Sequence, residues 1–200
     1  MQKKEYSAGM VKLSFWFQEF RQVLLLVNQG KTFAEIGRMN TEENIFMASS
    51  AARANLIFTT VVRRIKALNP SFYPLIEAGD LATQKLINLI ATMAVDQLFF
   101  DFVYEVYREK LIIGVAELAD SDLAIFFKNK QIQSDKVAGW TDETIKRLSR
   151  AYKTNLMEAG VIDQTTGNRK ILKPILDRSL EDCLIQNGMA VTLHALTGVR

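Results

Sequence analysis

The sequence predicts an all-α fold, a helical bundle with helix-turn-helix-like units and one small β-hairpin near the C-terminus. Only 10 of the 200 residues are Gly and 3 are Pro, too few to punctuate a sheet of many strands. A hydrophobic share of 48% is enough to build a packed core. Residues 81–113 carry apolar side chains on more than one helical face, so neighbouring helices must bury this stretch. We expect two domains, residues 1–113 and residues 114–200.

The first seventy residues indicate three helices. Apolar side chains recur at spacings of three and four over residues 14–28, and Gly30 is expected to end that helix. Thr32 is a candidate N-cap for a short second helix. Thr41, followed by two glutamates, is a further expected helix start. A longer third helix should run from about residue 48 to residue 68.

The third helix is basic. Its apolar stripe holds Ile57, Val61, Ile65 and Leu68. At about 100° per residue, four cations lie off the stripe or at its margin: Arg53, Arg63, Arg64 and Lys66. A long helix, a short helix, a turn and a basic helix resemble a helix-turn-helix, and these cations are candidate DNA contacts. The alternative is a packing layer of a three-helix bundle.

The hydrophobic stretch of residues 81–113 is expected to contain two helices. Asn69-Pro70 and Gly79-Asp80 break the chain before it, and Asp96 is a candidate cap inside it. Asp101 and Glu105 lie one turn apart in the second half. Such a pair could bind a divalent ion or perform acid–base chemistry. An ion-pair network with neighbouring Arg and Lys side chains is the interpretation that we favour.

We expect a helix over residues 117–130. The most informative segment follows it and begins at Thr141, the expected N-cap of the next helix. Leu148 and Tyr152 belong to its apolar face. Its basic face holds Lys146, Arg147, Arg150 and Lys153. Residues 161–172 then predict a hairpin whose turn is Thr165, Thr166, Gly167 and Asn168 and whose second strand carries Arg169 and Lys170.

A basic helix followed by a basic hairpin is typical of a winged helix-turn-helix, in which the helix enters the major groove and the hairpin touches the DNA backbone. The alternative is a packing module whose cations only keep it soluble. Asp177 or Ser179 should begin a further helix that ends near residue 186, and Gly188 separates it from the last apolar segment.

The sequence gives no support to catalytic chemistry. Cys183 and His194 are the only cysteine and histidine, which excludes an internal disulfide and leaves no partner for a nucleophile–base pair. Glycine-rich phosphate loops, zinc-protease motifs and nucleophile elbows are absent. We therefore expect no enzyme, no cofactor and no metal site. We also expect a cytoplasmic protein without a secretory signal or a transmembrane span, because Asp96, Asp101 and Glu105 interrupt the hydrophobic stretch.

Charge is segregated along the chain although the net charge is only +3. Residues 1–68 carry 10 Lys/Arg and 5 Asp/Glu, residues 69–122 carry 3 and 9, and residues 123–200 carry 12 and 8. Basic regions at both ends are the electrostatic footprint expected of a nucleic-acid binder. The alternative is chance clustering of charge on solvated helix faces.

Three segments carry a resemblance to a known family. YSAGMVKLSFWFQEFRQV near the start, GDLATQKLINL, and DQLFFDFVYEVYREKL resemble the BrxA family of bacterial BREX phage-defence systems. The similarity runs from about Tyr6 through the hairpin segment. It implies a small, cytoplasmic, non-enzymatic protein that works with other BREX components, among them a DNA methyltransferase and ATPases.

Two classes of function follow from the sequence. The leading hypothesis is binding of double-stranded DNA, mainly through phosphates, by residues 141–173 and by the third helix. A protein-interaction adaptor within the defence complex is the alternative, with its acidic middle meeting a basic partner. An RNA-binding protein of the antitermination kind is a third hypothesis, because a basic helical bundle suits RNA as well.

Overall fold

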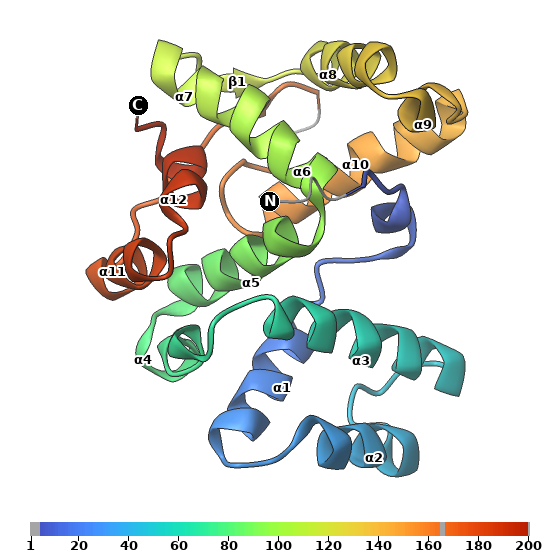
Figure 1. Ribbon diagram of the computed structural model, residues 1–200, viewed down its shortest axis with the longest axis vertical. Coiled ribbons are helices and arrows are strands. Elements are labelled where there is room, and N and C mark those ends of the chain that lie inside the picture. The colour runs from blue at the N-terminus through green and yellow to red at the C-terminus, as the bar shows by residue number, and fades with distance from the viewer. Residues whose placement is uncertain (1–4, 165–166, 200) are drawn as a thin grey trace. The chain divides into compact units, whose positions relative to one another are not determined.

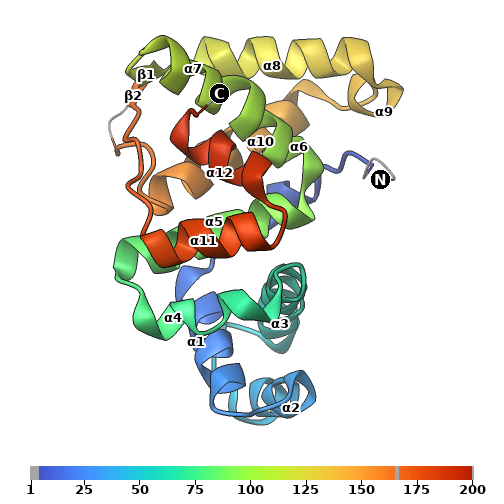
Figure 2. The same ribbon diagram turned by 60° about the vertical axis from the view of Figure 1, so that its left-hand side comes forward.

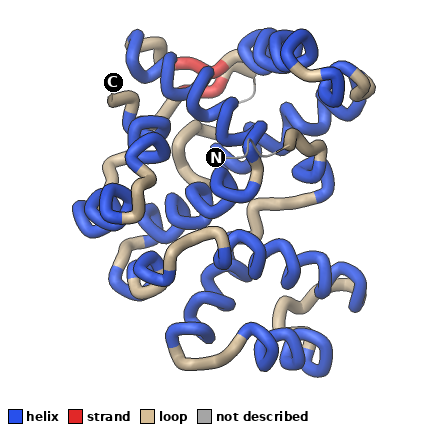
Figure 3. The backbone as a smooth tube through the Cα atoms, in the orientation of Figure 1, coloured by secondary structure: helices blue, strands red, loops and turns tan. Residues whose placement is uncertain are grey.

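The computed structural model describes residues 5–164 and 167–199 and confirms a mostly helical chain with one small antiparallel sheet (Figures 1 and 3). The chain divides into two compact units. We call residues 16–95 the helical unit, and residues 1–15 together with 96–200 the hairpin unit. The division differs from the predicted boundary at residue 113. Asp96 ends one helix and caps the next, and the residues that follow it fold with the C-terminal part of the chain.

The helical unit contains α1 (Phe17–Asn28), α2 (Phe33–Glu43), α3 (Ala51–Lys66), the 3-10 turn η2 (Pro70–Phe72), α4 (Leu75–Ala78) and α5 (Leu81–Val95). Helix α3 packs against α1, α2 and α5. The stripe predicted for α3 is confirmed, since Ile57, Val61 and Ile65 are buried. Helix α5 is buried on nearly all sides, as its apolar pattern predicted.

Local capping sets the helix starts in this unit. Thr32 caps α2 as predicted, and Glu35 completes a capping box by accepting a hydrogen bond from the Thr32 N–H at 2.8 Å. The helix start predicted at Thr41 is wrong. Thr41 lies inside α2, where its hydroxyl donates to the Gly37 carbonyl at 3.0 Å. Helix α3 instead begins after Ser50, whose Oγ accepts a hydrogen bond from the Arg53 N–H.

The hairpin unit begins with the 3-10 turn η1 (Gly9–Lys12) and resumes with a continuous helix built from α6 (Gln97–Phe102), the π-helical turn η3 (Val103–Tyr107) and α7 (Arg108–Ile113). Its other helices are α8 (Asp120–Gln133), α9 (Asp135–Ala138), α10 (Asp142–Glu158), α11 (Arg178–Gln186) and α12 (Ala190–Thr197). Helix α12 packs on η3 and α7 (Figure 2). Gly198 ends α12 with φ +69°, and a Cβ there would lie 2.6 Å from the Cβ of Leu111. The two chain segments approach closely because this position is a glycine.

The hairpin is confirmed, and it has a partner that sequence reasoning missed. Strand β1 (Glu117–Leu118) pairs antiparallel with β2 (Arg169–Lys170), and Ile162 pairs antiparallel with Ile171. β2 therefore lies between β1 and the segment at Ile162. Residues 117–118 were expected to begin a helix, but their backbone pairs with β2 and the helix starts at Asp120. Thr165 and Thr166 of the predicted turn lie outside the described residues.

Within the described ranges, no single helix is long and apolar enough to cross a membrane.

Candidate nucleic-acid interface

Helix α10 is fixed by its buried face. Thr141 Oγ1 accepts a hydrogen bond from the Thr144 N–H at 3.2 Å, which confirms the predicted N-cap. Tyr152 is fully buried, with its ring centroid 4.9 Å from that of Phe99 and 5.6 Å from that of Phe127. Leu148 and Leu156 are buried beside it. This anchoring leaves the predicted basic face of α10 at the surface of the hairpin unit.

One flank of α10 forms a basic groove with α8. The groove has a volume of about 290 Å³ and is lined by Lys146, Arg150 and Lys153 from α10. Asp120 of α8 also lines it and pairs with Lys153. Lys146 and Arg150 are exposed, and no carboxylate in the described residues pairs with either of them. These two cations are the ones best placed to meet a phosphate.

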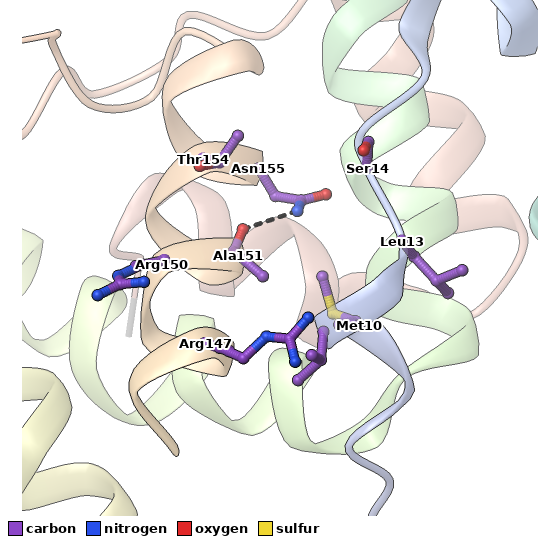
Figure 4. Close-up of a pocket in the computed structure, with 9 residues that line it drawn as sticks. Met10, Leu13, Ser14, Arg147, Arg150, Ala151, Thr154 and Asn155 are labelled. Atoms are coloured by element: carbon purple, nitrogen blue, oxygen red, sulfur yellow. Dashed lines mark hydrogen bonds between the residues drawn. The ribbon is translucent and has the colours of Figure 1, made fainter. Parts of the chain in front are cut away.

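Arg147 lies on the other flank of α10, beside the N-terminal segment of residues 10–14. A cavity of about 270 Å³ separates that segment from α10. Figure 4 shows the Arg147 guanidinium pointing toward Met10, whereas the Arg150 guanidinium points away from the N-terminal segment. The predicted basic face therefore borders two hollows, and Arg150 lines both of them.

The two predicted cations of the hairpin differ in burial and in hydrogen bonding. Arg169 is half-buried and donates a hydrogen bond to the Asp163 carbonyl at 3.2 Å and another to Met157 Sδ at 3.6 Å. It therefore ties the hairpin to the end of α10, which leaves it less available to a ligand. Lys170 is exposed, so it remains a candidate phosphate contact.

In the helical unit the structure corrects the placement of one predicted contact. Arg64 is only 1% exposed, because it lies on the face of α3 that packs into the core. Arg53, Arg63 and Lys66 are exposed. Two of them lie over aromatic rings, Arg53 at 5.0 Å from the Trp16 centroid and Lys66 at 5.1 Å from the Phe33 centroid.

A buried ion-pair network holds the N-terminal segment within the hairpin unit. Lys130, on α8, donates hydrogen bonds to Glu105 at 2.6 Å and to Asp101 at 3.3 Å. Tyr6 donates to the same Asp101 carboxylate at 2.6 Å. Burial by itself lowers the pKa of Lys130, but the Glu105 hydrogen bond and the charges of Asp101 and Glu105 outweigh it and raise the pKa above its ordinary value.

The ion-pair interpretation of Asp101 and Glu105 is thus confirmed, with a different cation from the neighbouring ones expected. Further carboxylates of the acidic middle are also paired, Asp120 with Lys153 and Asp122 with Lys110. No group of His, Cys, Asp and Glu side chains in the described residues is arranged to hold a metal ion.

Sequence reasoning missed the polar residues that accompany Arg147, namely Ser14, Thr154 and Asn155. It also missed Tyr6 and Lys130. Thr154 and Asn155 share α10 with Arg147, but Ser14 is more than a hundred residues from them, as Tyr6 is from Lys130. The sequence alone does not bring these segments together.

Comparison with known proteins places the whole chain in one family. Residues 4–188 match the family model described as BrxA. The "BREX protein BrxA" of Bacillus cereus (strain H3081.97) is 34% identical over 198 residues, which cover 99% of each chain. A crystal structure of an uncharacterized protein from Magnetospirillum magneticum has the same fold, with a TM-score of 0.80 at 16% identity over 98% of this chain and all of that one.

Proposed function

Because the chain belongs to the BrxA family, we propose that it is a non-enzymatic component of a bacterial BREX anti-phage defence system that binds double-stranded DNA largely through phosphate contacts. Its place of action is the cytoplasm. Other BREX components, such as a methyltransferase and an ATPase, are its expected protein partners.

The observation that carries the proposal is the pair of exposed cations, Lys146 and Arg150, on a helix whose opposite face is rigidly buried. DNA-binding proteins obtain most of their non-specific affinity from lysines and arginines that neutralise phosphates. Rigid anchoring of the helix through Tyr152 lowers the entropy cost of presenting those cations.

The order of elements around α10 supports the same conclusion. The chain runs from strand β1 through α8, the short helix α9 and α10 to the hairpin at Ile162 and Ile171. A winged helix-turn-helix has the same order of strand, two main helices and wing. In that arrangement α10 is the recognition helix and Lys170 contacts the backbone from the wing.

The test is fluorescence anisotropy of a labelled duplex over a series of salt concentrations. We expect log Kd to rise linearly with log salt. The double variant Lys146→Ala/Arg150→Ala should bind more weakly and lose about 0.9 unit of slope per lost phosphate contact. The matched control Lys128→Ala/Arg178→Ala removes two exposed cations from α8 and α11 and should leave the slope unchanged. Equal effects of the two variants would disprove the assignment to α10, and absence of binding at low salt would disprove DNA binding.

A protein-interaction adaptor is the second candidate, and exposed apolar side chains favour it. Ile175 is 93% exposed and Ile132 is 80% exposed. Four carboxylates of the acidic middle, Asp101, Glu105, Asp120 and Asp122, pair with lysines of the hairpin unit, which leaves less of that charge for a basic partner. Co-purification with a BREX component in the absence of duplex binding would support the adaptor. Stronger competition by RNA than by DNA of equal length would support the RNA-binding alternative.

A further inference from the structure

The cavity between the N-terminal segment and α10 has a lining unlike that of the basic groove on the other flank. Met10 and Val11 provide an apolar wall, Ser14, Thr154 and Asn155 provide polar groups, and Arg150 lines the cavity besides Arg147. No carboxylate lines it. The cavity lies entirely within the hairpin unit, and its volume of about 270 Å³ exceeds what a single bound ion fills.

Asn155 lines this cavity and holds a buried hydrogen-bond acceptor that is unused. The residue is only 1% exposed, and its Nδ2 donates to the Ala151 carbonyl at 2.7 Å. That bond fixes the orientation of the amide, so the remaining atom is the Oδ1 acceptor. Oδ1 has no hydrogen-bond partner among the described residues. Figure 4 shows it directed from α10 toward the N-terminal segment. A buried acceptor without a partner is unfavourable, which favours a ligand that donates an N–H or O–H.

Arg147 marks the other end of the cavity. Its guanidinium points toward Met10 and has no ion-pair partner in the part of the chain that the structure describes (Figure 4). Arg147 and Asn155 are eight residues apart on one helix, which corresponds to a rise of about 12 Å. A ligand that satisfies both must carry an anionic group at one end and a donor at the other, with an apolar body between them.

We propose that this cavity binds a nucleotide, with the phosphate at the Arg147 guanidinium, the base against Met10, and a base N–H group donating to Asn155 Oδ1. The nucleotide is either free in solution or an unpaired nucleotide of a DNA strand. Binding of an unpaired DNA nucleotide rests on the proposed DNA binding, whereas binding of a free nucleotide does not.

The first experiment is isothermal titration calorimetry of the full chain with each of the four deoxynucleoside monophosphates and with inorganic phosphate. We expect at least one nucleotide to bind more tightly than phosphate. Arg147→Ala and Asn155→Leu should each weaken nucleotide binding at least tenfold, whereas Arg178→Ala on α11 should leave it unchanged. Circular dichroism of each variant verifies folding. Should Asn155→Leu fail to fold, Val11→Trp adds bulk at a half-buried position of the cavity wall and is expected to block binding without altering α10.

The second experiment identifies the source by comparing a blunt duplex with the same duplex carrying a single-stranded overhang. If the duplex with the overhang binds at least tenfold more tightly than the blunt duplex, and Asn155→Leu abolishes this preference, the cavity binds an unpaired DNA nucleotide. Binding of free nucleotides without that preference assigns it to a soluble nucleotide, and this result stands even if duplex binding fails. If neither binds, or if phosphate binds as tightly as every nucleotide, the proposal is wrong, while blunt-duplex binding would still uphold the proposed function.

Discussion

The cations of the two units have partly different partners: aromatic rings lie beside cations in both units, and carboxylates pair with cations of the hairpin unit. In the helical unit, Arg53, Lys66 and Lys85 lie over the rings of Trp16, Phe33 and Phe17. In the hairpin unit, Lys110, Lys130 and Lys153 pair with carboxylates. The helical unit carries 8 Lys/Arg in 80 residues and the hairpin unit 17 in 120. Because cations are paired with carboxylates in the hairpin unit, that unit should respond more strongly to changes of charge and pH. A basic sequence is therefore a poor measure of the basic surface that is left for a ligand.

Each unit contains one tryptophan, which allows the two to be followed separately. Trp16 lies in the helical unit and Trp140 in the hairpin unit. The variant Trp16→Phe leaves a reporter of the hairpin unit, and Trp140→Phe leaves a reporter of the helical unit.

The largest effect is expected from Lys130→Met, which keeps the length of the side chain and removes its charge. Asp101 then remains half-buried without its cation, because the Lys130 side chain is 3% exposed and that of Asp101 13%. Loss of one partner of a buried pair costs about 3–5 kcal/mol. Since Glu105 is partly solvated, we expect a loss of about 2–4 kcal/mol in the free energy of unfolding.

The measurement is urea denaturation followed by Trp140 fluorescence in the Trp16→Phe background. Lys128→Met, on the same helix but exposed, is the matched control and should change the free energy of unfolding by less than about 0.5 kcal/mol. A similar loss in both variants would show that the buried network does not stabilise the hairpin unit.

The second-largest effect is expected from alkaline pH, which should lower the stability of the hairpin unit more than that of the helical unit. Burial raises the pKa of Tyr6, Tyr107 and Tyr152, and the Glu105 hydrogen bond helps raise that of Lys130, all four in the hairpin unit. All four groups are protonated in both the folded and the unfolded chain below about pH 10, so their contribution to stability is complete there. As pH rises from the ordinary pKa values toward the raised ones, the unfolded chain loses protons first, and stability falls.

In the helical unit burial also raises the pKa of Tyr73, but fewer groups are involved. The Trp140 transition in thermal unfolding should therefore shift to lower temperature between about pH 10 and pH 11 by more than the Trp16 transition. Equal shifts of the two transitions would contradict the difference between the units.

Duplex binding provides a third test of the comparison. Lys146→Ala/Arg150→Ala, on α10, should weaken binding about tenfold, or about 1.4 kcal/mol. Arg53→Ala/Lys66→Ala, on α3, should weaken it less, because both of these cations lie over aromatic rings. Anisotropy titrations at a single low salt concentration measure both. A larger loss in the α3 variant would move the main DNA contact to the helical unit.

The smallest effects are expected from the helix caps. Ser50→Ala removes the cap of α3 and Thr141→Ala that of α10, and each should lower the stability of its own unit by about 1 kcal/mol. Trp16 should report the first and Trp140 the second. If both tryptophans report each substitution equally, the two units unfold as one.

The sequence predicted those parts of the fold whose cause is local. Thr32, Asp96, Thr141 and Asp177 cap helices as expected, because a capping side chain bonds to backbone groups only two or three residues away. Gly30 follows α1 in the left-handed conformation, for the same reason of short range.

The parts that could not be predicted depend on distant segments. Strand β1 has two residues and therefore no periodicity, and only its pairing with Arg169–Lys170 defines it. Lys130 resembles any lysine near a helix end until Asp101 and Glu105 are seen beside it. On α10 the periodicity placed the basic residues on the correct face but could not show that the N-terminal segment lies along one flank of it.

The π-helical turn η3 has a consequence for insertions and deletions. A π turn contains about one residue more than an α turn, so this helix carries one residue in surplus. Removing it would rotate all that follows by about 100°. The Tyr107 hydroxyl, which donates to the Leu172 carbonyl at 3.2 Å, and Leu111, which abuts Gly198, would both lose their partners. The number of residues between 103 and 107 thus sets the phase of the helix, and a one-residue deletion there should be less tolerated than a substitution at an exposed position.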